Sequence, residues 1–187
     1  MARKLVSAAT SEKAGTLGIW VLGFDDTDQK RLIADFLAAA LAAAFVMPAY
    51  KSKATPSRIR SLRLIGLTNR LDLDRTCAEA EGNNLARFLT ALPANKLDAV
   101  SYTGLIKEMA GKEGWQYKRY GVKELEKLGA GAFLAVAQGN DNDSAAIVRL
   151  RYRPGSQAMT PALSLVGKGI IFDTGGTNLK PFASMLD

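Results

Sequence analysis

The residues best suited to chemistry in this 187-residue sequence lie between positions 167 and 180. This segment contains four glycines, two lysines and one aspartate: Gly167, Lys168, Gly169, Asp173, Gly175, Gly176 and Lys180. Glycine lets the backbone approach a ligand or metal closely and form turns that orient neighbouring side chains. One carboxylate and two amines held in this way are groups that can bind an anion, a cation or a developing charge.

The residue types alone leave more than one interpretation of this segment. A glycine-rich turn with solvated lysines is the simplest. A phosphate-binding loop is less well supported, because the Walker pattern requires Ser or Thr after its lysine and Lys168 is followed by Gly169. The dinucleotide-binding pattern Gly-x-Gly-x-x-Gly is also unmatched.

The chain has no histidine, which excludes several classes of catalytic and metal site. Histidine-dependent Ser and Cys triads, zinc sites with paired histidines, and haem with a proximal histidine all require an imidazole. The single cysteine, Cys77, excludes an intramolecular disulfide and a two-thiol zinc site. Any metal site in this sequence therefore uses carboxylates, backbone groups or amines.

The elements that position these residues follow the pattern of an α/β protein. The first half predicts a strand at 16–23, a helix from about 29 to 44, capped by Thr27 or an aspartate, and a strand at 59–67. The second half predicts helices at 74–92, 100–112 and 122–128, and strands at 115–121, 133–139, 145–152 and 162–167. The segment with the chemistry then follows the C-terminal end of a strand, where α/β proteins place their sites.

Three short motifs in the same segment carry a family resemblance. They are Val166-Gly167-Lys168-Gly169, Phe172-Asp173-Thr174-Gly175-Gly176 and Lys180-Pro181. Their order and spacing resemble the signature of the leucyl aminopeptidase family, the M17 metallopeptidases. Upstream, residues 84–97 look like the segment that opens the family's catalytic domain, and residues 129–139 resemble its glycine-rich strand ending in Gln-Gly. The resemblance covers residues 80–187.

The resemblance implies a metal-dependent hydrolase that removes N-terminal, leucine-like residues from peptides. Lys168 and Asp173 would be metal ligands and Lys180 a catalytic residue, in a site with two divalent cations, Zn²⁺ or Mn²⁺, with Mg²⁺ a further candidate. An amine binds a metal only when neutral, and two nearby dications favour loss of the proton from Lys168. The metals would activate water, and Lys180 would stabilise charge on the carbonyl oxygen. Met185 is implied as a substrate-pocket residue.

The helix-rich pattern that begins near residues 68–73 predicts a domain boundary there, so we expect a small N-terminal α/β domain at residues 1–70. The resemblance implies that residues 71–187 form the first part of a three-layer α/β/α catalytic domain. The family assembles as hexamers that enclose the active sites, so a homo-oligomer is expected of the complete protein.

The family's remaining metal ligands are not found in this sequence. The next carboxylate ligand would lie eleven residues after Lys180, beyond Asp187. We therefore expect a truncated chain with little or no aminopeptidase activity of its own, because Lys168 and Asp173 alone do not complete a two-metal site.

A basic surplus supports the rival hypothesis of a non-catalytic module that binds DNA or a phosphate ligand. The chain has 25 Lys and Arg against 18 Asp and Glu, a net charge of +7. Between positions 51 and 75 the basic residues clearly outnumber Asp72 and Asp74: Lys51, Lys53, Arg58, Arg60, Arg63, Arg70 and Arg75. No aromatic interleaving accompanies this cluster, so nucleic-acid binding is the weaker hypothesis.

Other residues are expected to have structural roles. Trp20, Phe36 and Phe88 are predicted to lie in the core, Cys77 to be a buried small apolar residue, and Arg87 to form a surface or interdomain pair. No secretory signal or membrane-spanning segment is evident, so a cytoplasmic protein is expected.

Overall fold

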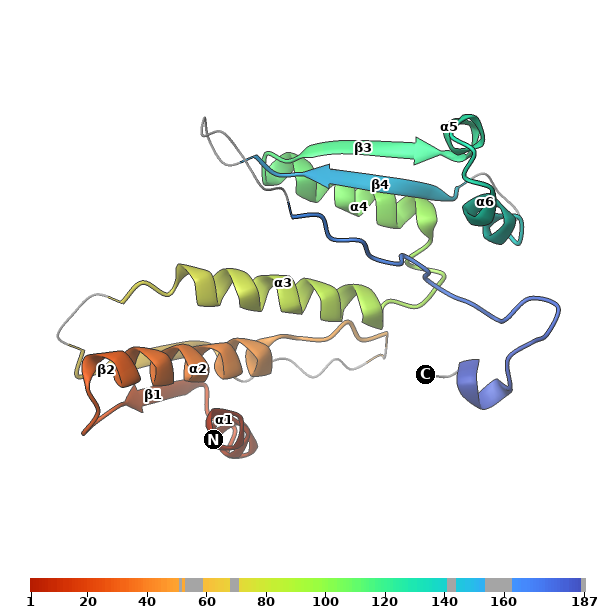
Figure 1. Ribbon diagram of the computed structural model, residues 1–187. Coiled ribbons are helices and arrows are strands. Elements are labelled where there is room, and N and C mark those ends of the chain that lie inside the picture. The colour runs from red at the N-terminus through yellow and green to blue at the C-terminus, as the bar shows by residue number, and fades with distance from the viewer. Residues whose placement is uncertain (51, 53–58, 68–70, 141–143, 154–162, 186–187) are drawn as a thin grey trace. The chain divides into compact units, whose positions relative to one another are not determined.

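The computed structural model describes residues 1–50, 52, 59–67, 71–140, 144–153 and 163–185 (Figure 1). The chain packs as two compact units, Met1–Leu92 and Pro93–Asp187. The domains predicted from the sequence, 1–70 and 71–187, stay a prediction, since packing alone does not show which part folds independently.

The first unit contains the predicted strand–helix–strand order. Strand β1 (Thr16–Trp20) and strand β2 (Ser61–Ile65) pair in parallel, with Thr16 opposite Ser61 and Trp20 opposite Ile65. Helix α2 (Asp26–Ala44) lies between them in the sequence. A parallel pair needs such a crossover, so this half of the prediction is confirmed.

Helix α2 begins where its sequence supplies a cap. The side chain of Asp25 accepts hydrogen bonds from the backbone N–H groups of Thr27 and Asp28, at 3.0 and 2.9 Å. Asp26 and Asp28 in the first turn also interact favourably with the positive end of the helix. The helix therefore starts three residues earlier than predicted, with one of the predicted aspartates as its cap.

The core of the first unit joins a helix that the sequence did not predict. Helix α1 (Ala2–Ser11) buries Val6, which clusters with Ala40 of α2 and Ile59. Phe36 packs against this cluster, as predicted. The sequence of α1 is amphipathic, with its polar and apolar residues on different faces, and the prediction overlooked this pattern. Packing of the apolar face against α2 stabilises the helix.

Two of the predicted core aromatic residues are exposed. Trp20 is 62% exposed and Phe88, on helix α3 (Asp74–Ala91), is 37% exposed, so both predictions are wrong. Trp20 is the last residue of strand β1, at the end of a two-stranded sheet, where few neighbours are available to cover a large ring. Cys77 is half-buried rather than buried.

Arg87 on α3 connects α3 to the C-terminal end of α2. Its guanidinium donates to the carbonyl oxygen of Ala42 at 2.9 Å and lies 4.9 Å from the centre of the Phe45 ring. It also donates to Asn84 Oδ1 at 3.0 Å. Both helices lie within the first compact unit, so Arg87 pairs two helices of that unit.

The second unit is built on an antiparallel pair of strands. Strand β3 (Gln116–Gly121) pairs with strand β4 (Ala146–Arg151), with Gln116 opposite Arg151 and Gly121 opposite Ala146. Helix α4 (Ala99–Lys112) lies along this sheet (Figure 1), and the Tyr117 hydroxyl donates to the carbonyl oxygen of Thr103 at 3.3 Å. These three elements confirm the predicted ranges to within a residue or two.

The predicted strand at 133–139 is wrong, because residues Gly131–Ala137 form helix α6. It follows helix α5 (Val122–Lys127) after Gly129, which has a φ of +68°. The run Ala-Phe-Leu-Ala-Val-Ala is short and apolar throughout, so its periodicity cannot distinguish a strand from a helix. Its alanines and leucine favour the helix.

The predicted strand at 162–167 is also wrong for the residues that the structure describes. Residues 163–167 have no regular structure, and Leu163, Leu165 and Val166 are 85%, 86% and 99% exposed. Strand geometry depends on hydrogen bonds to a neighbouring strand, and residues 163–167 pair with no strand among the described residues. The segment with the chemistry therefore does not follow the end of a strand.

The fold is thus mixed α/β, as predicted, with two small sheets of two strands each in the described residues. Among those residues, no helix combines the length and hydropathy needed to cross a membrane.

Candidate active site

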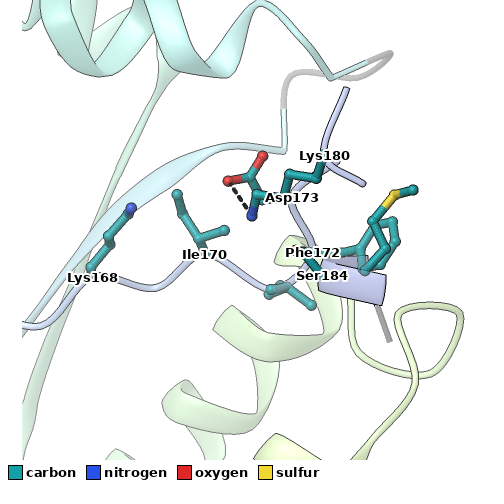
Figure 2. Close-up of a pocket in the computed structure, with 8 residues that line it drawn as sticks. Lys168, Ile170, Phe172, Asp173, Lys180 and Ser184 are labelled. Atoms are coloured by element: carbon teal, nitrogen blue, oxygen red, sulfur yellow. Dashed lines mark ion pairs between the residues drawn. The ribbon is translucent and has the colours of Figure 1, made fainter. Parts of the chain in front are cut away.

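An open pocket of about 360 Å³ collects the residues that the sequence singled out (Figure 2). All of its lining residues come from positions 168 to 185: Lys168, Ile170, Ile171, Phe172, Asp173, Lys180, Ser184 and Met185. One continuous segment therefore supplies the whole lining, and the local path of the backbone determines how the charged groups meet.

A tight turn brings Asp173 and Lys180 together. The Asp173 carboxylate accepts a hydrogen bond from the backbone N–H of Gly175 at 2.8 Å. The backbone N–H of Lys180 donates to the carbonyl oxygen of Thr174, also at 2.8 Å. These two bonds close the intervening residues into a loop, so side chains seven positions apart lie on the same side of the pocket.

Gly175 is required by the geometry of this turn. Its φ of +100° is a conformation that L-residues rarely adopt. A Cβ at this position would lie 2.5 Å from the carbonyl oxygen of Asn178 and 3.0 Å from the backbone nitrogen of Lys180. Gly176 also has a positive φ, of +83°, but a Cβ there would meet nothing within 4 Å. Space therefore excludes a side chain at 175 only.

Asp173 and Lys180 form an ion pair inside the pocket. The distance from Lys180 Nζ to Asp173 Oδ2 is 3.1 Å, and both side chains are close to half exposed (Figure 2). The hydrogen bond from Gly175 lowers the pKa of Asp173, and the hydrogen bond and charge of Lys180 lower it further. Asp173 is therefore held as a carboxylate, with one oxygen on the backbone and the other on an ammonium.

Lys168 lines the same pocket but does not join the ion pair. In Figure 2 its amine lies apart from the Asp173–Lys180 pair. Its charge also lowers the pKa of Asp173, but less than the contacts with Gly175 and Lys180 do. The structure thus brings two of the three predicted polar residues into direct contact and places the third at the same pocket.

Met185 lines the pocket as well, at the end of the short 3-10 helix η1 (Phe182–Met185). A hydrogen bond from the backbone N–H of Ser184 to the carbonyl oxygen of Pro181, at 2.9 Å, stabilises this turn. Ile170, Phe172 and Ser184 also line the pocket and were not expected there. Ile170 and Phe172 lie within the segment of the motifs and Ser184 lies just after it, so closeness in the chain was the available signal.

The pocket has the right donors for a divalent cation, but few of them. The exposed Asp173 carboxylate already holds one cationic group, which shows that the position attracts positive charge. Lys168 adds an amine that binds a metal once neutral. Within the described residues, no group of three or more His, Cys, Asp or Glu side chains is placed to hold a metal. The donors present therefore fit part of a metal site rather than a closed one.

The basic cluster predicted between positions 51 and 75 is only partly described. Lys51, Lys53, Arg58 and Arg70 lie outside the described residues. Of the others, Arg75 pairs with Glu79 one helical turn along α3, at 2.7 Å. The rival hypothesis of a basic binding module at this cluster stays a prediction.

Comparison with known proteins gives consistent matches. The family described as "Cytosol aminopeptidase family, catalytic domain" matches residues 84–187. A probable cytosol aminopeptidase from Acidovorax sp. (strain JS42) is 37% identical over 168 residues, which cover 88% of this chain and 33% of that protein. The chain spans about a third of the length of the curated relatives it matches.

Two solved structures resemble this chain in fold. A mutant of tomato leucine aminopeptidase matches with a TM-score of 0.81 and 22% identity, over 93% of this chain and 36% of that one. At this identity the match shows the fold alone. The bottromycin maturation enzyme BotP, solved in complex with Mn, matches with a TM-score of 0.72 and 26% identity, over 98% of this chain and 39% of that one.

Proposed function

The chain belongs to the cytosol aminopeptidase family, the M17 metallopeptidases, and from this premise we propose that its pocket is part of a peptidase active site. The proposed reaction is hydrolysis of the N-terminal residue, leucine or a similar one, from a peptide. The observation that carries the proposal is the 3.1 Å ion pair between Asp173 and Lys180 in a pocket that Lys168 also lines.

Asp173 and Lys168 would hold the metal ions, two per complete site. Zn²⁺ and Mn²⁺ both suit one amine and one carboxylate, and Mg²⁺ suits the carboxylate. The Mn in the BotP structure supports manganese as one choice. When bound, the metals supply Lewis acidity and activated water. The hydrogen bond from Gly175 fixes the direction of the Asp173 carboxylate, which lets it present an oxygen toward a cation.

Lys180 would act on the substrate. Its ammonium lies at the pocket, and its charge would stabilise the negative charge that develops on the scissile carbonyl oxygen. A metal at Asp173 would replace Lys180 as the cation nearest to that carboxylate and free the ammonium for this role.

The apolar lining residues would provide a surface for a leucine-like side chain. Met185 is half-buried, and Ile170 and Phe172 extend the apolar surface around it. Methionine has a flexible, polarisable side chain that adapts to apolar groups of different shape. We therefore propose Met185 as a substrate-binding residue.

Several properties of the complete protein follow the family and belong to this proposal. They are a three-layer catalytic domain beginning in residues 71–187, a homo-hexamer, peptide substrates and a cytosolic location, the last supported by the names of the relatives. We also propose that the 187-residue chain has little activity by itself, because Lys168 and Asp173 are too few ligands for two ions.

The test uses the chain alone and a chimaera in which it is followed by the remaining two thirds of the Acidovorax relative. We expect Mn²⁺-dependent hydrolysis of leucine p-nitroanilide by the chimaera and almost none by the chain. Lys180→Ala should lower kcat of the chimaera by about a hundredfold or more, whereas Lys107→Ala on the exposed side of α4 should not.

Two outcomes would contradict the proposal. A folded, metal-loaded chimaera without turnover would exclude the peptidase assignment for this pocket. Robust turnover by the 187-residue chain would show that Lys168 and Asp173 suffice, and that the ligand count is wrong.

A further inference from the structure

The part of the pocket that contains Lys168 is held differently from the turn between Asp173 and Lys180. One hydrogen bond to the Asp173 carboxylate and another from the Lys180 N–H close that turn. Residues 168–172, by contrast, make no hydrogen bond to any other residue that the structure describes. The position of Lys168 therefore depends on contacts of another kind.

Tyr102 of α4 lies beside this part of the segment. A Cβ at Gly169, the residue between Lys168 and Ile170, would lie 3.7 Å from Tyr102 Cε1, an ordinary van der Waals distance. The ring thus leaves room for a methyl group, and a longer side chain in the same direction would meet it. Gly169, unlike Gly175, does not have a positive φ. Its small size, rather than its conformational freedom, is what the neighbouring ring requires.

The backbone of Tyr102 is fixed at the start of α4. Its N–H donates to the carbonyl oxygen of Asp98 at 2.9 Å, and the capping box between Asp98 and Ser101 closes the same turn. The next residue, Thr103, accepts the hydrogen bond from Tyr117 of β3. The turn that carries the half-buried Tyr102 is therefore held by its own cap and by the sheet.

Both neighbours of Gly169 belong to the pocket. Lys168 and Ile170 line it, and their side chains point to the same side of the segment (Figure 2). A shift of the backbone at Gly169 would therefore move both side chains together. Misplacing a reacting group by about 1 Å can lower a reaction rate by about a hundredfold, so a contact that limits such a shift has a large effect on function.

We propose that Tyr102 is a positioning residue of the pocket that acts through the backbone at Gly169. Its ring limits movement of the segment toward α4 and so holds Lys168 and Ile170 at the pocket. The consequence for metal binding rests on the proposed function, in which Lys168 is a metal ligand. The ring rather than the hydroxyl performs this role, because the Tyr102 atom nearest to a Cβ at Gly169 is a ring carbon.

The first test is nuclear magnetic resonance of the 187-residue chain, and it needs no metal. The ring of Tyr102 should shift the proton resonances of Gly169 through its ring current. Tyr102→Leu should remove this shift and lower the order parameter of the Gly169 amide to below about 0.6, the range of a flexible backbone. Tyr102→Phe keeps the ring and should keep both properties.

The second test measures Mn²⁺ binding to the chimaera by electron paramagnetic resonance, together with turnover. Tyr102→Leu should weaken Mn²⁺ binding by about tenfold, the effect typical of losing a group that orients a metal ligand. At saturating Mn²⁺, kcat should change little, because the turn between Asp173 and Lys180 is unaffected. Tyr102→Phe should restore the Mn²⁺ affinity. A variant that only unfolded the protein would lower kcat and leave the Mn²⁺ affinity of the folded fraction unchanged.

Val100→Ala is the matched control. It shortens an apolar side chain in the same first turn of α4, and that side chain is 59% exposed. The Gly169 resonances and the Mn²⁺ affinity should stay as they are in the unmodified protein. Leucine at position 102 is apolar and a good helix former, so α4 should still form, and a thermal melt of each variant verifies this.

Three results would overturn the proposal. They are the absence of a ring-current shift at Gly169 in the unmodified chain, Mn²⁺ binding by Tyr102→Leu as tight as by the unmodified chimaera, and equal losses in Tyr102→Leu and Tyr102→Phe. Failure of the proposed function gives a different result. A chimaera that binds no Mn²⁺ would contradict the metal site, whereas the Gly169 resonances would still decide whether Tyr102 holds the segment.

Discussion

The pocket segment, residues 168–185, and the α4–β3–β4 layer belong to the same unit but are stabilised in different ways. In the layer, strands β3 and β4 pair in a defined register, helix α4 packs on one face of the sheet, and Asp98 caps the start of α4. The pocket segment has one short 3-10 helix. Two hydrogen bonds close the turn that positions its charged groups: one from the Gly175 N–H to the Asp173 carboxylate, and one from the Lys180 N–H to the Thr174 carbonyl oxygen. Chemistry at the pocket thus depends on local backbone geometry, whereas stability depends on contacts between elements far apart in sequence.

Truncation of a core residue in the second unit should cause the largest loss of stability. If it does not, the contrast between this unit's core and the pocket segment is wrong. Leu125 of α5 is 2% exposed, so Leu125→Ala should destabilise the second unit by about 3 kcal/mol. Leu179 in the pocket segment is 72% exposed, and Leu179→Ala should change stability by less than about 0.5 kcal/mol. Urea denaturation of both variants measures the difference. Equal losses would show that the pocket segment shares the core.

Substitutions of Gly175 and Gly176 distinguish the effect of a steric clash from that of backbone strain. Gly175→Ala adds a Cβ 2.5 Å from a carbonyl oxygen, so the turn must open and Asp173 must lose its Gly175 bond. We expect turnover of the chimaera to fall by about tenfold or more, with little change in the melting of the α4–β3–β4 layer. Gly176→Ala meets nothing and should cost only the strain of a positive φ, about 1 kcal/mol.

Turnover of the chimaera and thermal melting curves are measured for both glycine variants and compared. If both variants lose turnover equally, close packing at residue 175 is not what positions Asp173. If Gly175→Ala also melts the layer, the pocket is not locally determined.

The smallest expected effect concerns pH and the start of α4. Hydrogen bonds from the side chain and the backbone N–H of Ser101 lower the pKa of Asp98. A lowered pKa in the folded state adds stability above the unfolded value, near 4, and this stability is lost as pH falls through the folded pKa. Acid should therefore destabilise the unmodified chain more than Asp98→Asn, which keeps a capping oxygen without titrating.

Thermal melts at pH 6 and pH 2.5, followed by circular dichroism, measure this difference. An equal loss in both proteins would show that the cap does not respond to protonation of Asp98.

Local signals predicted much of this molecule. Asp25 and Asp98 begin helices because a side-chain oxygen can cap nearby backbone N–H groups, and both helices start within a few residues of the predicted positions. The clustering of glycines and charged residues between 167 and 180, and the resemblance of this segment to a family signature, likewise pointed to one site. The structure brings Asp173 and Lys180 into contact. Each of these features depends on residues a few positions apart.

The wrong strand predictions concern segments whose structure depends on distant parts of the chain. Residues 131–137 were predicted as a strand and form a helix, whereas 163–167 were predicted as a strand and pair with none in the described residues. In both cases the outcome depended on a neighbour that periodicity does not reveal. Helix α1 is a failure of another kind, because its amphipathic sequence was a local signal that the prediction overlooked.

The sequence by itself therefore determined which groups line the pocket: an amine, a carboxylate and a second amine, with a glycine where only glycine fits. Tertiary structure decided which apolar runs became strands and which did not. The physical reason is range. A turn is closed by bonds between near neighbours, whereas a strand exists only when a distant segment supplies the other half of its hydrogen bonds.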